Sequence, residues 1–193
     1  MIKSDQEYKR IWDEFGNPAD FTIDDMKWID ANVPSNYRDL TITLSENDQI
    51  LVKDIADKRT QAAKEAGIHK NWGSVSAHDI DLEGFGAEVA FCRIFKLEPD
   101  LTIGARKGGC DTISKKGKKI DVKWTGNLDN GLLVKTSKAK GESDVYVLVI
   151  GNFPSYKVIG FISENDLFKD ENIKQSKFGH FNYHLSPEQL RSF

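Results

Sequence analysis

The sequence that decides the fold is GGCDTISKKGKKIDVKW, residues 108–124. Two short runs rich in β-forming residues flank a turn that ends in glycine, a pattern typical of a β-hairpin. A three-residue loop over residues 115–117 suits a type I turn closed by Gly117 in the left-handed region. This turn predicts that Ser114 lies opposite Lys118 and thereby fixes the register of the hairpin.

The predicted register brings two carboxylates together. It places Thr112 opposite Ile120 and Asp111 opposite Asp121. Because side chains alternate between faces, Asp111, Asp121 and Lys123 share one face. Opposed Cβ atoms lie about 5 Å apart, so the two like charges repel unless a cation lies between them. Mg²⁺ or Mn²⁺ suits carboxylate oxygens, and Lys123 can orient a water molecule or stabilise developing negative charge.

Asp111, a nine-residue gap and Asp121-Val122-Lys123 resemble the signature of the PD-(D/E)XK nuclease superfamily, over roughly residues 82–163. The resemblance implies a restriction-endonuclease-like core, an αβββαβ-type mixed sheet flanked by helices. It also implies a Mg²⁺-dependent nuclease, an endonuclease acting on DNA, for which Mn²⁺ can substitute. Asp111, Asp121 and the Val122 carbonyl would bind the metal. The alternative is an ordinary surface hairpin with charged residues on its wet face.

A helix predicted over residues 81–95, with Asp81 as its cap, could supply a further carboxylate to the expected metal site. Glu88 lies in the apolar stripe of this helix, where a carboxylate is costly unless it is paired or binds a cation. In the resembled superfamily a helix before the core hairpin often supplies a glutamate to the metal site, and Glu88 matches that role. The alternative is a salt bridge from Glu88 to Arg93 or to a lysine.

Two other acidic residues are alternatives to these. Glu83 could replace Glu88, but it lies on the other side of the helix, near its N-terminus. Asp100 could replace Asp111, because Pro99-Asp100 is a literal Pro-Asp pair 21 residues before Asp121. Asp111 is preferred, because it belongs to a strand paired with Asp121, whereas the Pro-Asp pair marks the end of a helix.

The chain is expected to be α/β, with a helical N-terminal extension over residues 1–76 and the nuclease-like core over residues 77–193. Within the extension, helices are predicted over 2–15, 22–31 and 45–66, the last with Ser45 as its cap. After the hairpin, strands are predicted at 132–136, 144–150, 156–162 and 178–183, with a short helix after Ser163 and a helical turn from Ser186. The connector 137–143 is short for the second core helix.

Charge is unevenly distributed along the chain, whose net charge is −3. Residues 103–140 contain ten Lys/Arg against three Asp, whereas residues 1–50 contain five basic and eleven acidic residues. A basic segment around two aspartates favours a polyanionic partner such as DNA. The lysines expected to meet the nucleic-acid backbone are Lys115, Lys116, Lys118, Lys119 and Lys135. For Lys135, plain solvation is an equal alternative.

Composition excludes some classes of protein. Hydrophobic residues make up 39% and charged residues 30%, an ordinary globular balance. The longest apolar run, residues 145–150, is far too short to span a bilayer. Two cysteines fit a reducing, cytoplasmic setting rather than a disulfide scaffold. Two other functions stay open, a non-catalytic nucleic-acid-binding module and a protein-interaction module. The acidic N-terminal segment could serve as a homodimer arm, as a cap that positions DNA or as a docking surface for a partner.

Overall fold

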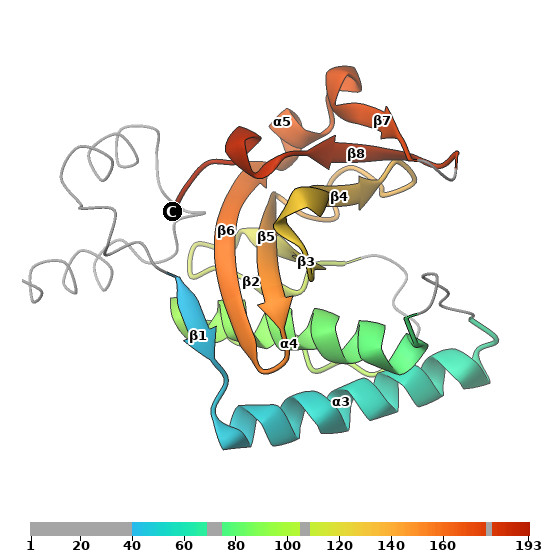
Figure 1. Cartoon of the computed structure of the whole chain (residues 1–193), viewed down its shortest axis with the longest axis vertical. Helices are drawn as coiled ribbons and strands as arrows, with labels where there is room; N and C mark the ends of the chain where they lie inside the picture. Colours follow the sequence, from blue (N-terminus) through green and yellow to red (C-terminus); the bar gives the residue numbers. More distant parts are fainter. Residues whose placement is uncertain (1–39, 69–74, 105–108, 177–178) are drawn as a thin grey trace, which may run out of the picture.

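The computed structural model describes residues 40–68, 75–104, 109–176 and 179–193. Within them the architecture is mixed α/β, with a five-stranded sheet, a three-stranded sheet and two long helices (Figure 1). In chain order, the elements are β1 (Thr41–Thr43), α3 (Glu46–Glu65), α4 (Ala77–Phe95), β2 (Thr112–Ile113), β3 (Lys119–Thr125), β4 (Leu132–Lys135), β5 (Val145–Asn152), β6 (Ser155–Ser163), α5 (Glu164–Leu167), β7 (Ile173–Gln175) and β8 (Phe181–Leu185). The α/β class expected from the sequence is confirmed.

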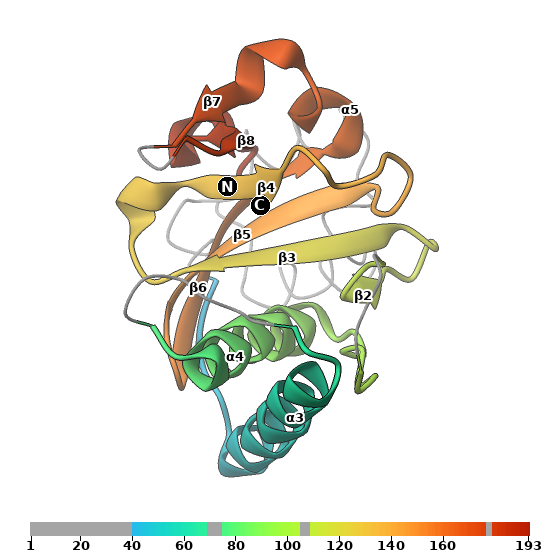
Figure 2. The ribbon, with the colours of Figure 1, turned by 90° about the vertical axis from the view of Figure 1, so that its right-hand side faces the viewer.

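The five-stranded sheet, of order β1-β6-β5-β3-β2, is the middle of three layers. Helix α4 covers one face, with α3 packed on the far side of α4, and the three-stranded sheet β4-β8-β7 covers the other face (Figure 2). Strand β5 contributes side chains to the hydrophobic cores on both sides of the main sheet. Val147 packs on the helix side, while Tyr146 and Leu148 pack toward the small sheet. Burial on both faces explains the continuous apolar run of β5, and its predicted central position is confirmed.

The caps of α3 and α5 follow the predicted chemistry. The Ser45 hydroxyl accepts the Asp48 N–H at 3.2 Å at the start of α3, and Gly67 ends it with a φ of 67°. The Ser163 hydroxyl plays the same part for the short helix α5, accepting the Asp166 N–H at 3.2 Å. Both N-caps satisfy backbone donors that the first helical turn leaves without partners.

Helix α4 begins four residues before the predicted start, so the assignment of Asp81 as its cap is wrong. Ser76 is the cap, accepting the Asp79 N–H at 3.0 Å. Asp81 instead lies in the second turn, buried, and accepts a hydrogen bond of 2.8 Å from the Thr60 hydroxyl. This contact ties α4 to α3 rather than starting the helix.

Strand β3 runs parallel to β5 and antiparallel to β2, and β5 and β6 form the predicted antiparallel pair. The connection from β3 to β5 contains the 3₁₀ turn Leu128–Asn130, strand β4 and a series of turns. It therefore lacks the second core helix of the expected αβββαβ pattern, because the connector 137–143 is too short for one and forms turns. The strand β4 joins the small sheet instead.

The expected N-terminal extension is not wholly helical. Strand β1 pairs antiparallel with β6 at the edge of the main sheet, and Val52 and Ile55 of α3 belong to the helix-side core. The helices predicted over 2–15 and 22–31 lie outside the described residues. Strand β7 was not predicted. Among the described helices, none has both the length and the apolar character needed to cross a membrane.

Candidate active site

The hairpin of β2 and β3 forms as its turn chemistry predicts. The Ser114 N–H donates to the Lys118 carbonyl at 2.8 Å, and Gly117 has a φ of 80°, in the left-handed region. Thr112 lies opposite Ile120. The predicted loop and register are therefore confirmed over these residues, and the hairpin forms the β2 edge of the main sheet.

Asp111 departs from the expected register. The regular ladder begins at Thr112, and the Asp111 N–H donates to the Ile120 carbonyl at 2.8 Å. Asp111 and Thr112 thus both lie opposite Ile120, as in a β-bulge, and a bulge changes the direction of the Asp111 side chain. The Asp111 carboxylate turns to the edge of β3, where its Oδ2 accepts the Val122 N–H at 2.7 Å. Asp111 therefore does not form the expected ladder pair with Asp121.

Asp121 projects from β3 toward the layer of the small sheet, beside Tyr146 of β5, and is 2% exposed. Each of its oxygens meets an ammonium group. Lys123 contacts Oδ1, and Lys138 Nζ lies 2.8 Å from Oδ2. Burial of a carboxylate this complete is costly without such partners. The two lysines therefore neutralise Asp121.

Lys138 is a site residue that the sequence analysis missed. It belongs to the turns between β4 and β5, and its ammonium lies 3.0 Å from Glu142 Oε2 and donates to the Gly109 carbonyl at 3.1 Å. Burial alone would lower the pKa of Lys138, but the charges of Asp121 and Glu142 outweigh it and raise the pKa. The side chain is therefore charged. Its position in a polar connector gave no sequence signal for this role.

Asp111 and Asp121 are not paired in the ladder, but the charge of Asp121 affects the pKa of Asp111. Burial and the charge of Asp121 raise the pKa of Asp111 to about 6, against the lowering effect of Lys123. Burial is the larger cause of this rise, and the negative charge of Asp121 adds to it. Asp111 and Asp121 therefore meet the electrostatic expectation for a cation-binding pair.

Glu88 reaches the same edge from the opposite side of the sheet. Burial and the charge of Asp111 raise its pKa well above the ordinary value. Its Oε2 lies 3.3 Å from the Arg59 guanidinium of α3, and its side chain is 12% exposed. Arg93, the partner expected in the alternative interpretation, instead pairs with Asp48 at 2.8 Å. Asp111 thus interacts with both Glu88 and Asp121.

The two alternative carboxylates have structural contacts elsewhere. Glu83 Oε2 accepts the Phe153 N–H at 2.8 Å and the Tyr156 hydroxyl at 3.1 Å, at the turn between β5 and β6. Asp100 Oδ1 accepts the N–H and the hydroxyl of Thr102, at 2.9 and 2.6 Å. These contacts favour Glu88 and Asp111 as the site residues.

Three buried polar atoms near Asp121 and Lys138 form no hydrogen bond within the described part of the chain: Glu142 Oε2, Ser143 Oγ and the Tyr146 hydroxyl. For Glu142, the ion pair with Lys138 has the distance but not the direction of a hydrogen bond. Burial and the charge of Asp121 raise the pKa of Tyr146, so its hydroxyl is neutral and can donate. Buried polar groups normally have partners, and Ser143 is close enough to Tyr146 to act on its pKa, as Lys138 is to pair with Glu142.

The donor chemistry of the site fits a hard divalent cation, because carboxylates and carbonyls are the preferred ligands of Mg²⁺ and Mn²⁺. The Val122 N–H faces Asp111, and the two backbone groups of one residue in a strand point to the same side, so its carbonyl faces Asp111 too. Among the described residues, no three Asp, Glu, His or Cys side chains form a ready-made metal cage. The two oxygens of Asp121 contact the ammonium groups of Lys123 and Lys138.

The lysines expected to contact nucleic acid are exposed. Lys115, Lys116 and Lys118 lie in and beside the hairpin turn, and Lys135 lies on β4. Lys119 also has a structural part, because its N–H donates to Asp144 at 2.8 Å. Lys115, Lys116 and Lys118 thus lie at the turn of the hairpin whose strands carry the carboxylates, and their contact with nucleic acid stays a prediction.

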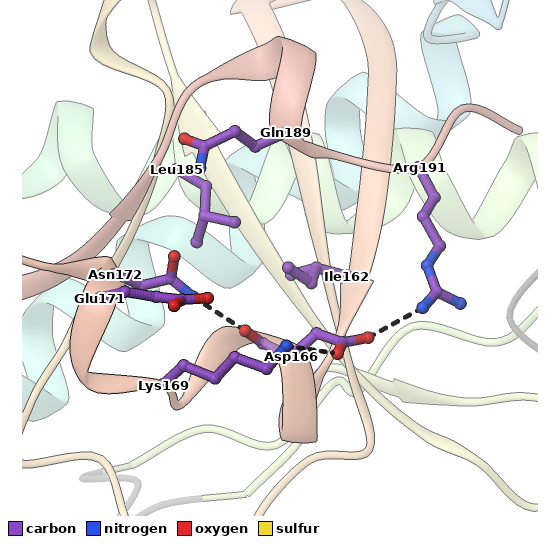
Figure 3. Close-up of a pocket in the computed structure, with 8 residues that line it drawn as sticks. All are labelled: Ile162, Asp166, Lys169, Glu171, Asn172, Leu185, Gln189 and Arg191. Atoms are coloured by element: carbon purple, nitrogen blue, oxygen red, sulfur yellow. Dashed lines mark hydrogen bonds and ion pairs between the residues drawn. The ribbon is translucent and has the colours of Figure 1, made fainter.

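A separate pocket of about 280 Å³ lies between α5 and the small sheet and contains none of the predicted site residues (Figure 3). Its charged groups neutralise one another, since Asp166 pairs with Lys169 at 3.1 Å and Arg191 at 2.8 Å. The pocket therefore offers no concentrated charge for catalysis.

No protein-family model matches the sequence, and no match was found among curated proteins.

Proposed function

We propose that the chain is a Mg²⁺-dependent nuclease that hydrolyses phosphodiester bonds in DNA, built on a restriction-endonuclease-like core. The observation that carries the proposal is the carboxylate pair at the edge of β3. Burial and the charge of Asp121 raise the pKa of Asp111, so the two groups repel each other in the metal-free protein. A divalent cation bound between them would relieve this repulsion.

Asp111, Asp121 and the Val122 carbonyl would hold the cation, with Glu88 completing the site from α4. A bound Mg²⁺ supplies a Lewis acid for the phosphate and lowers the pKa of a bound water. Mn²⁺ has the same ligand preference and would substitute for it.

Lys123 would act on the reacting groups. Its ammonium contacts Asp121, which places it beside the expected metal position on the same strand face. From there it can orient the attacking water or stabilise charge on the phosphate. The exposed lysines of the hairpin turn would bind the nucleic-acid backbone without reading its sequence.

Cleavage assays test the proposal directly. Supercoiled plasmid and labelled single-stranded DNA are incubated with the protein in Mg²⁺, in Mn²⁺ and in EDTA. We expect metal-dependent cleavage by the wild type and a loss of roughly 100-fold or more in Asp121→Asn and Lys123→Met. Asp129→Asn, at an exposed position, is the matched control and should keep full activity.

Circular dichroism confirms that each variant is folded. Full activity in folded Asp121→Asn would refute the site, whereas no cleavage of either substrate by the folded wild type in any metal would refute the function.

One observation favours a second candidate, a non-catalytic nucleic-acid-binding module. Lys123 and Lys138 neutralise Asp121, so this carboxylate has charge partners within the chain. Tight, salt-dependent DNA binding without metal-dependent cleavage would identify this function. DNA as the partner, a homodimer and a cytoplasmic location remain predictions for either candidate.

A further inference from the structure

Lys138 is held by three oxygen atoms. Its ammonium lies 2.8 Å from Asp121 Oδ2, 3.0 Å from Glu142 Oε2 and 3.1 Å from the Gly109 carbonyl. The Gly109 carbonyl accepts a hydrogen bond from this ammonium, and the two carboxylates lie within ion-pair distance of it. The side chain is only 17% exposed. Lys138 therefore has a fixed position inside the site rather than a solvated one.

Two carboxylates and a carbonyl are also the ligands that a hard divalent cation takes. The hydroxyls of Ser143 and Tyr146, 1% and 0% exposed, form no hydrogen bond within the described residues. Tyr146 lies beside Asp121 in the sheet register, so its hydroxyl belongs to the same polar region. The oxygen atoms of this region thus outnumber the two ammonium groups, of Lys123 and Lys138, that contact Asp121.

The backbone around Lys138 is anchored after the lysine. The Lys119 N–H donates to Asp144 at 2.8 Å, and the Gly141 N–H donates to Glu164 at 2.7 Å. A change at Lys138 can therefore occur in its flexible four-carbon side chain while the turn keeps its place.

We propose that Lys138 is a built-in competitor for the divalent cation. Its ammonium holds Asp121 Oδ2 in the metal-free protein and leaves this oxygen when a cation binds there, so Lys138 raises the metal concentration that the site requires. After release, the ammonium stays paired with Glu142 on the same turn. This inference rests on the proposed metal site.

Lys138 is better suited to this exchange than Lys123. Lys123 projects from β3 two residues after Asp121 and contacts the other oxygen, Oδ1. Its path along the strand keeps it beside Asp121 whether or not a cation is bound. Lys138 approaches from a separate turn and can withdraw without disturbing β3.

Isothermal titration calorimetry with Mn²⁺ tests the exchange independently of cleavage. We expect Lys138→Met, which keeps the hydrocarbon chain and removes the charge, to bind Mn²⁺ about ten-fold tighter or more, equivalent to about 1.4 kcal/mol. Lys138→Arg, which keeps the charge, should bind as weakly as the wild type. Lys140→Met, an exposed lysine of the same turns, is the matched control and should also match the wild type.

The outcomes separate this inference from the proposed function. Equal Mn²⁺ affinity in the wild type and Lys138→Met, lost in Asp121→Asn, would overturn the competitor and leave the metal site intact. Mn²⁺ binding by none of the proteins would overturn both.

A second measurement covers the case in which Lys138→Met does not fold. Lysine Cε and Nζ resonances of the wild type are followed by NMR during Mg²⁺ titration, with Lys138→Arg used to assign the Lys138 signal. We expect the Lys138 signal to shift on saturation and the Lys140 signal to stay. Saturation with Mg²⁺ that leaves the Lys138 signal unchanged would overturn the proposal.

Discussion

Replacing Asp111 by asparagine should stabilise the metal-free protein at alkaline pH while abolishing cleavage. Burial and the charge of Asp121 raise the pKa of Asp111 from 3.8 to about 6. At pH 8 this carboxyl is ionised in both the folded and the unfolded chain, but its folded environment disfavours the charge. The difference in pKa corresponds to about 3 kcal/mol of lost stability.

The stability gained by Asp111→Asn depends on pH in a defined direction. Because the folded state binds its proton more tightly, the wild type recovers stability as the pH falls through 6 toward 3.8. The advantage of the variant should therefore be about 3 kcal/mol at pH 8 and roughly half of that at pH 5. Asparagine keeps an oxygen for the Val122 N–H, so this hydrogen bond is not lost.

Urea unfolding followed by tryptophan fluorescence, in EDTA at both pH values, measures this advantage. Asp129→Asn, at an exposed position, is the control and should show no such pH-dependent gain. Saturating Mn²⁺ should stabilise the wild type and reduce the difference at pH 8. A variant less stable than the wild type at pH 8, or an advantage that does not shrink at pH 5, would falsify the crowded-carboxylate interpretation.

Three further predictions concern packing, pairing and binding. Gly86→Ala should lower the free energy of unfolding, measured in urea, by about 1–3 kcal/mol, because the new Cβ would overlap a buried tyrosine hydroxyl of β6. Gly84→Ala, at an open position of the same helix, should raise the free energy of unfolding by about 0.5–1 kcal/mol. Arg59→Met should cost about 3 kcal/mol by removing the partner of Glu88, and adding Glu88→Gln should recover most of the loss; strict additivity in the double-mutant cycle would contradict this pairing. Lys118→Glu should weaken DNA binding and reduce the slope of log affinity against log salt by about 1, measured by fluorescence anisotropy; an unchanged slope would remove Lys118 from the interface.

The elements predicted correctly are those fixed by local chemistry. The turn at Gly117 sets the hairpin register because a left-handed glycine closes a three-residue loop regardless of the rest of the fold. The caps at Ser45 and Ser163 likewise depend on residues three positions apart. The Ser76 cap has the same spacing to Asp79, so the sequence contained the signal for the true start of α4.

The parts missed depend on contacts distant in the chain. Lys138 meets Asp121, and Arg59 meets Glu88 from another helix, and such pairs leave no periodic pattern in the sequence. Strand β1 has three residues and pairs only at the sheet edge with β6, so its local signal is weak. The bulge at Asp111 was not predicted either. A regular alternation of side chains places Asp111 opposite Asp121, whereas its carboxylate accepts the N–H of the next residue, Val122.

The free energy of folding does not explain why Asp121 lies buried between two lysines. Replacing a buried ion pair or triad by apolar residues of similar volume is often neutral or stabilising, whereas removing one member is costly. On the same strand, Ile120 and Val122 pack into the helix-side core without any such cost. A chain that needed only a stable hairpin would be served by an apolar residue at position 121. The local conflict between a charged cluster and the surrounding apolar layers is expected where a site has a function beyond folding, so Asp121 is the first position at which to test for one.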